Sequence, residues 1–233
     1  ENEYIDSISS WWVTLHGHAN PFIAKKIYEQ ALQLEQVIFA GFTHTPAIDL
    51  AEKLIEKLPA GFSKIFYSDN GSTSTEVALK MALQFWWNKD IKPKRNKILA
   101  FKNAYHGDTF GAMGVSERSV FTLAFQDLFF EVIFIDTPNE TNVDSIYEIV
   151  EKHASNIAAF IYEPLIQGAG GMKMYDAIYL NALLKKIKEK EIICIADEVM
   201  TGFFRTGKFF ASDYMEEKPD IILTDINMPF LSG

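Results

Sequence analysis

The segment Ile192-Ile193-Cys194-Ile195-Ala196-Asp197 decides the fold class of this chain. It is an apolar run of strand length, rich in β-branched residues, and it ends on a carboxylate. We therefore expect a strand whose last residue, Asp197, lies at its carboxyl end.

Similar short apolar runs recur along the chain and alternate with stretches of helical period. The predicted strands are 64–69, 97–101, 132–136, 157–163, 192–197 and 221–225, and the predicted helices are 21–39, 46–58, 72–87 and 175–190. This alternation predicts an α/β fold, a three-layer α/β/α domain with a mainly parallel sheet and helices on both faces. In such sheets ligands bind beyond the carboxyl ends of the strands, so the residues after each strand are the candidates for a site.

Composition limits the class of protein and its partners. The 233 residues are 48% hydrophobic, enough for a large core, and carry a formal net charge of -9. Nucleic acid and anionic membrane surfaces would repel this charge and are not expected as partners. The single cysteine, Cys194, lies in an apolar run and is interpreted as a buried thiol, and one cysteine forms no internal disulfide. With no signal peptide and no membrane-spanning run visible, we expect a cytoplasmic protein.

A candidate anion site follows the first predicted strand, where Gly71 and Ser72 open the next predicted helix. Free backbone N–H groups and the positive end of the helix dipole favour an anion there, and Ser72 adds a hydroxyl. Taken alone, this segment is more typical of a capping box, with Thr73 as the cap residue and Glu76 three positions later. The two interpretations are compatible.

Two further loops carry polar groups. Tyr105, His106 and Asp108 follow the strand 97–101, and a tyrosine ring can stack on a flat ligand. The alternative is a loop with a packed tyrosine and a surface histidine. Glu163 is followed by a proline that ends its strand, and the glycine-rich run 168–171 is interpreted as a flexible turn and not as a second phosphate site.

Asp197 is the most informative of these residues. A buried carboxylate without a partner is costly, so a neutralising group is expected. A protonated pyridine nitrogen about 4 Å away would attract the carboxylate by roughly 4 kcal/mol at an effective dielectric near 20. This attraction would raise the pKa of the ring nitrogen by about three units. The alternative is an aspartate that caps the following loop.

Taken in order, these motifs resemble the class III (fold type I) pyridoxal-phosphate-dependent aminotransferases over nearly all of residues 5–220. The motifs are the glycine-serine cradle, Tyr-His-Gly-Asp, Glu-Pro, and the strand that leads into Asp-Glu-Val and Thr-Gly-Phe-Phe-Arg-Thr-Gly. Within the class, Ser10-Trp11-Trp12 with His16-Gly17-His18, residues 41–47 and residues 110–113 are similar to the members that act in biotin synthesis.

The resemblance implies pyridoxal 5′-phosphate as cofactor and a role for each matching residue. Gly71 and Ser72 would hold the phosphate. Tyr105 would stack on the ring or contact substrate, Asp197 would pair with the ring nitrogen, and Val199 would pack on the opposite ring face. The substrate would be contacted by Trp12, Asp108 and Arg205. Asp197 and Tyr105 are thus the implied catalytic residues, and no metal ligands are expected.

The implied reaction transfers an amino group from S-adenosylmethionine to 8-amino-7-oxononanoate and gives 7,8-diaminononanoate, in a homodimer. Two alternatives remain. In the first alternative, the chain is another class III aminotransferase that uses a different amino donor. In the second, it is a non-catalytic fragment, either cofactor-binding or receiver-like.

The two ends of the chain depart from the family pattern. We expect a partial N-terminal segment at 1–45, an incomplete cofactor-binding large domain at 46–220 and an atypical tail at 221–233, with the family's C-terminal domain absent. Family spacing puts the Schiff-base lysine at Ile226, and no lysine follows Lys218. About fifteen tail residues around Asp225 instead resemble the phosphoacceptor segment of a response-regulator receiver. We therefore expect the chain as it stands to be inactive.

Overall fold

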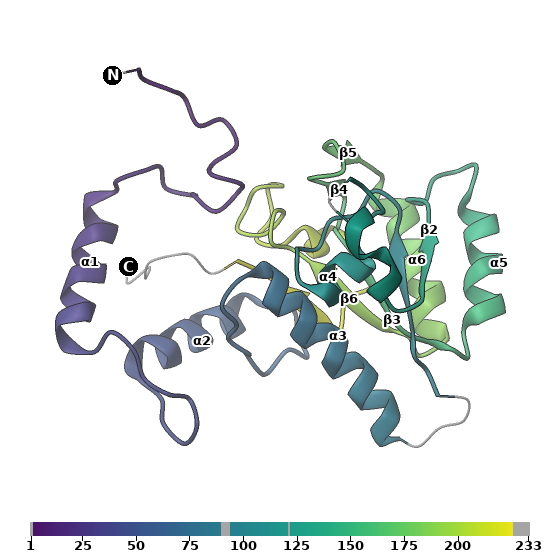
Figure 1. The fold of residues 1–233 in the computed structure, drawn as a ribbon, viewed down its shortest axis with the longest axis horizontal. Helices are drawn as coiled ribbons and strands as arrows, with labels where there is room; N and C mark the ends of the chain where they lie inside the picture. The colour runs from purple at the N-terminus through teal and green to yellow at the C-terminus, as the bar shows by residue number, and fades with distance from the viewer. Residues whose placement is uncertain (1, 90–93, 121, 226–233) are drawn as a thin grey trace. The chain divides into compact units, whose positions relative to one another are not determined.

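The computed structural model describes residues 2–89, 94–120 and 122–225 (Figure 1). The chain forms two compact units, one of Tyr67–Thr224 and one of Glu1–Phe66 with Asp225–Gly233. Among the described residues, no helix combines the length and the apolar character that a membrane crossing requires.

The larger unit is built on a five-stranded sheet in which every pairing is parallel. Its strands lie in the order β2 (Val132–Ile135), β1 (Lys97–Phe101), β3 (Ile157–Tyr162), β6 (Ile193–Asp197) and β7 (Ile221–Leu223). A separate antiparallel pair is formed by β4 (Ile166–Gln167) and β5 (Lys173–Met174). The predicted parallel α/β fold is confirmed, and five of the predicted strands end within two residues of the expected positions.

Helices cover both faces of this sheet because successive strand residues point to opposite sides. On one face, Leu99, Phe160 and Cys194 pack in one core cluster with residues of α5 (Val143–His153) and α6 (Ala177–Glu189). On the other face, Ile98, Ile161 and Ile195 pack with residues of α3 (Gly71–Asn88) and α4 (Phe110–Val115). The larger unit therefore has three layers, as the sequence predicts.

The smaller unit contains α1 (Pro21–Gln33) and α2 (Thr45–Lys57). Asn20 caps α1 by accepting the N–H groups of Phe22 and Ile23, and proline occupies an early position in both helices, where its missing N–H is harmless. None of the residues of α1 is buried. The helix predicted for residues 21–39 is thus present but ends earlier, at Gln33.

One predicted strand, at residues 64–69, is wrong. The segment forms no ladder with a described strand, and Phe66 is 64% exposed. An apolar run becomes a strand only when neighbouring backbone accepts and donates its hydrogen bonds. In the structure β7 pairs with β6 and completes the sheet of the larger unit, which ends at Thr224. The domain division at residues 46 and 220 stays a prediction.

Candidate active site

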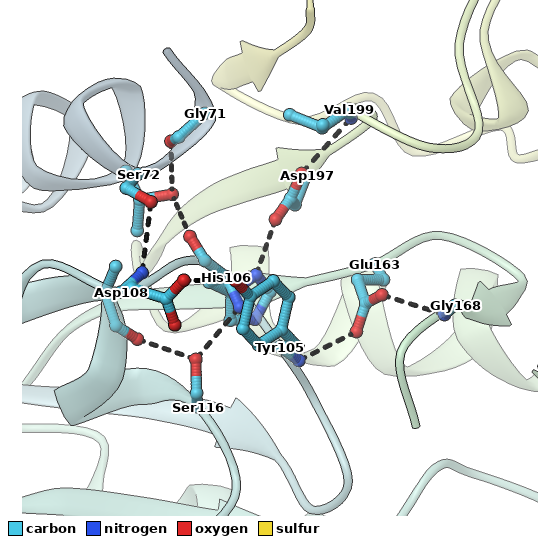
Figure 2. Close-up of polar contacts among 12 residues, drawn as sticks. Gly71, Ser72, Tyr105, His106, Asp108, Ser116, Glu163, Gly168, Asp197 and Val199 are labelled. Carbon is cyan, nitrogen blue, oxygen red and sulfur yellow. Dashed lines mark hydrogen bonds and ion pairs between the residues drawn. The ribbon is translucent and has the colours of Figure 1, made fainter. Parts of the chain in front are cut away.

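Polar side chains gather where β1, β3 and β6 end, beside the first turn of α3 (Figure 2). Tyr105, His106 and Asp108 lie on the loop after β1, Glu163 follows β3 directly, and Asp197 is the last residue of β6. Because the strands are parallel, their carboxyl ends share one edge of the sheet, which is where such sheets bind ligands.

Asp197 has a partner that the sequence argument did not foresee. Its Oδ2 lies 2.6 Å from Nδ1 of His106, and the two side chains are 8% and 0% exposed. Its Oδ1 accepts the backbone N–H of Val199 at 3.2 Å. Asp197 therefore caps the following loop and is already paired inside the chain. Each carboxylate oxygen keeps a further lone pair for a ligand.

His106 is buried, so the interpretation of a surface histidine is wrong. Its backbone N–H donates to Ser116 Oγ at 2.9 Å, and its carbonyl oxygen accepts from Thr75 Oγ1 at 2.9 Å. Burial by itself lowers the pKa of His106, but the hydrogen bond and negative charge of Asp197, with the charge of Glu163, together raise it. Within the described residues its Nε2 has no hydrogen-bond partner.

The first turn of α3 begins with a reciprocal capping box. Asn70, and not Thr73, is the cap residue. Its side chain accepts the N–H of Thr73, whose hydroxyl accepts the N–H of Asn70. The N–H groups of Gly71 and Ser72 precede the first intrahelical bond and point out of the helix end. Capping and anion binding are thus compatible here, as expected.

The loop after β1 closes over this helix end. The N–H of Asp108 donates to Ser72 Oγ at 3.0 Å. Gly107 has a φ of +121°, and a Cβ built there would overlap the atoms of Ser72. The close approach of the two segments therefore requires glycine at this position.

Two more predicted residues join the same site. The hydroxyl of Tyr105 donates to Asp108 Oδ2 at 2.8 Å, and partial burial together with this bond raises the pKa of Tyr105 to about 12, so the phenol stays neutral. A Cβ built on Gly71 would lie 3.5 Å from a methyl carbon of Val199, so these two residues are neighbours. The structure thus links Gly71, Ser72, Tyr105, Asp108, Asp197 and Val199 through direct contacts (Figure 2).

Glu163 is a site residue to which the sequence analysis gave no role. It is 6% exposed, and its two oxygens accept the N–H groups of Tyr105 and Gly168 at 3.2 and 3.0 Å. The signal available in the sequence was a strand-ending carboxylate, the same feature that marked Asp197. The glycine-rich run beyond it is a packed loop and not simply a flexible turn, because a Cβ at Gly170 would overlap the carbonyl oxygen of Asn103.

Arg205 lies on a loop whose two ends are fixed by the buried Glu198. This carboxylate accepts hydrogen bonds from Thr201 Oγ1, from the N–H of Ala211, and from both the N–H and Oγ of Ser212. Partial burial lowers the pKa of the Arg205 guanidinium.

Trp12 belongs to the smaller unit, and Ile226, the position expected for the lysine, lies outside the described residues.

Residues 1–226 match the family of aminotransferase class III. The chain is 50% identical to adenosylmethionine-8-amino-7-oxononanoate aminotransferase of Synechococcus elongatus, over 94% of this chain and 54% of that protein. The Staphylococcus aureus protein of the same name is 40% identical, over 95% of this chain and 52% of that one.

Among solved structures, adenosylmethionine-8-amino-7-oxononanoate aminotransferase from Methanocaldococcus jannaschii superposes with a TM-score of 0.89 and 38% identity, over 95% of this chain and 51% of that one. The chain spans about half the length of the curated relatives it matches. With a family match over almost its whole length, the chain belongs to the class III aminotransferases.

Proposed function

We propose that this chain binds pyridoxal 5′-phosphate and is the cofactor-binding part of an enzyme that moves an amino group from S-adenosylmethionine to 8-amino-7-oxononanoate. One observation carries the proposal. The buried carboxylate of Asp197, at the carboxyl end of β6, binds His106, and the loop that bears His106 contacts the start of α3.

The residues of the site fit this cofactor. The outward N–H groups of Gly71 and Ser72, with the helix dipole, suit its phosphate. Asp197 is the group that would hold the ring nitrogen protonated, and Tyr105 and Val199 would contact the ring. When bound, the cofactor supplies an electron sink that stabilises negative charge at a substrate carbon.

His106 and Asp108 act through their neighbours. His106 fixes the orientation of the Asp197 carboxylate by binding one of its oxygens. The carboxylate of Asp108 accepts a hydrogen bond from the hydroxyl of Tyr105, and its backbone N–H donates to Ser72 Oγ, so Asp108 connects the ring-contacting residue to the phosphate cradle. Both arrangements keep the site in one geometry before a ligand arrives, which lowers the entropy cost of binding.

The choice of substrate rests on the names of the relatives and on motifs that they share with this chain. Trp12, Asp108 and Arg205 are proposed as substrate contacts. The active form is proposed to be a homodimer in the cytoplasm.

Titration of the purified chain with pyridoxal 5′-phosphate, followed by quenching of its tryptophan fluorescence, tests the proposal. We expect saturable binding that Asp197→Asn weakens by about 10- to 100-fold, because the neutral amide attracts the pyridinium less. Asp144→Asn, on the exposed side of α5, is the matched control and should leave the affinity unchanged. Absence of saturable binding, or equal affinity of wild type and Asp197→Asn, would refute the proposal.

A further inference from the structure

Two loops at the carboxyl edge of the sheet meet across the side chain of Glu163. Oε2 accepts the N–H of Tyr105 on the loop after β1, and Oε1 accepts the N–H of Gly168 on the loop between β4 and β5 (Figure 2). Each oxygen thus serves a different loop. A carboxylate can do this because both of its oxygens accept, whereas a glutamine offers only one acceptor.

The same two loops also touch at other points. Gln167 Nε2 donates to the carbonyl oxygen of Lys102 at 2.7 Å, and Gly170 lies so close to the carbonyl oxygen of Asn103 that a Cβ would overlap it. The contact is therefore a continuous interface between the two loops, with Glu163 as its buried polar centre.

Consecutive backbone N–H groups in the site are held by side chains from different parts of the fold. Glu163 accepts that of Tyr105, and Ser116 Oγ accepts that of His106. The Cα of Tyr105 lies between the two peptide planes that these bonds hold, so both bonds together set the direction in which the Tyr105 side chain leaves the backbone. Loss of the first bond would release the backbone N–H of Tyr105, while the bonds of His106 to Ser116 and Asp197 remain.

We propose that Glu163 is a positioning residue, which holds the Tyr105 ring in its place at the candidate cofactor site by tying the backbone of Tyr105 to that of Gly168. This inference rests on the proposed function for the identity of the ligand. It requires a carboxylate that reaches both loops, so neither Glu163→Gln nor the shorter Glu163→Asp should replace the wild-type residue.

The first measurement needs no ligand. Amide hydrogen exchange of the chain is followed by NMR at about pH 8.5, above the pKa of about 7 to which burial raises Glu163. We expect exchange at Tyr105 or Gly168 to become about ten-fold faster in both variants, with exchange at His106 unchanged. Glu148→Gln, an exposed carboxyl on α5, is the control.

The second measurement uses pyridoxal 5′-phosphate and inorganic phosphate as probes. The free cofactor is achiral, so the visible circular dichroism of its bound form reports the asymmetry of the ring's surroundings. We expect both Glu163 variants to lose at least half of this signal per bound cofactor, while the affinity for inorganic phosphate, which depends on the Ser72 cradle, stays within about two-fold of wild type.

The outcomes separate this inference from the proposed function. If wild type does not bind the cofactor, the proposed function fails, and the exchange rates alone decide whether Glu163 ties the two loops. If wild type binds and both variants keep its circular dichroism and exchange rates, the positioning role is overturned. Equal losses of dichroism and of phosphate affinity would also overturn it, because they would indicate general damage to the fold.

Discussion

Nδ1 of His106 lies 2.6 Å from Oδ2 of Asp197, although 91 residues separate the two in the sequence. Both side chains are buried, so this pair sits in surroundings that screen charge poorly. The pair joins the loop after β1 to the end of β6 and supplies the partner that a buried carboxylate requires.

The stability of the chain should depend on this pair as a unit. His106→Ala leaves the Asp197 carboxylate buried without its partner, and we expect a loss of about 3–5 kcal/mol in the free energy of unfolding. In the double variant with Asp197→Asn, His106→Ala should cost much less. Urea unfolding of all four proteins measures the coupling. Additivity within about 0.5 kcal/mol would show that the two residues do not interact.

Glu163 should make stability fall as the pH rises. Its pKa is raised by burial from 4.5 to about 7 in the folded chain, so between these values the folded state binds more protons than the unfolded state. The free energy of unfolding then decreases by about 3 kcal/mol across this window.

Glu163→Gln should remove that decrease, and urea unfolding at several pH values measures it. His106, whose pKa is also raised, contributes a decrease of the same sign as the pH passes through its folded pKa, and this part should remain in the variant. A wild-type profile that is flat or rises between about pH 4.5 and 7 would contradict the assignment.

Gly107→Ala should damage the proposed anion site more than substitution of another glycine that also has a positive φ. Gly107 has a φ of +121°, and the added Cβ would meet both the backbone and the side chain of Ser72. We expect a loss of about 2–4 kcal/mol in stability, the sum of strain and overpacking, and weaker binding of inorganic phosphate.

Gly171→Ala is the matched control for that experiment. Gly171 has a φ of +92°, but its added Cβ would meet nothing within 4 Å. It should therefore show the strain alone, about 1–2 kcal/mol, with phosphate binding intact. Equal effects of the two substitutions on stability and on phosphate binding would mean that the close approach of Gly107 to Ser72 contributes to neither.

The 233-residue chain by itself should form no 7,8-diaminononanoate from S-adenosylmethionine and 8-amino-7-oxononanoate. No lysine follows Lys218 in the sequence, and loss of a positioned acid–base group alone typically costs about 100- to 10,000-fold in rate. The assay compares the chain with the Synechococcus elongatus relative at equal concentration. Product formation at the rate of that relative would show that another residue replaces the Schiff-base lysine that family spacing puts at Ile226.

The sequence by itself determined the fold class and indicated the edge of the sheet at which the candidate site lies. Apolar runs such as 192–197 specify strands through their own composition, and their carboxylate ends mark where a ligand belongs. The order of the motifs also identified the family, because each motif is local and can be read without knowing what it touches.

Only the tertiary structure decided which groups meet. The apolar run at 64–69 is as suitable for a strand as that at 97–101, but only the second has strands on both sides to pair with. His106 gave the same local signal as an exposed loop residue, and Glu163 gave only that of a strand-ending carboxylate. Their importance arises from Asp197 and from the N–H groups of Tyr105 and Gly168. Local sequence encodes propensity and periodicity, whereas burial and long-range hydrogen bonds depend on segments that the chain brings together only when it folds.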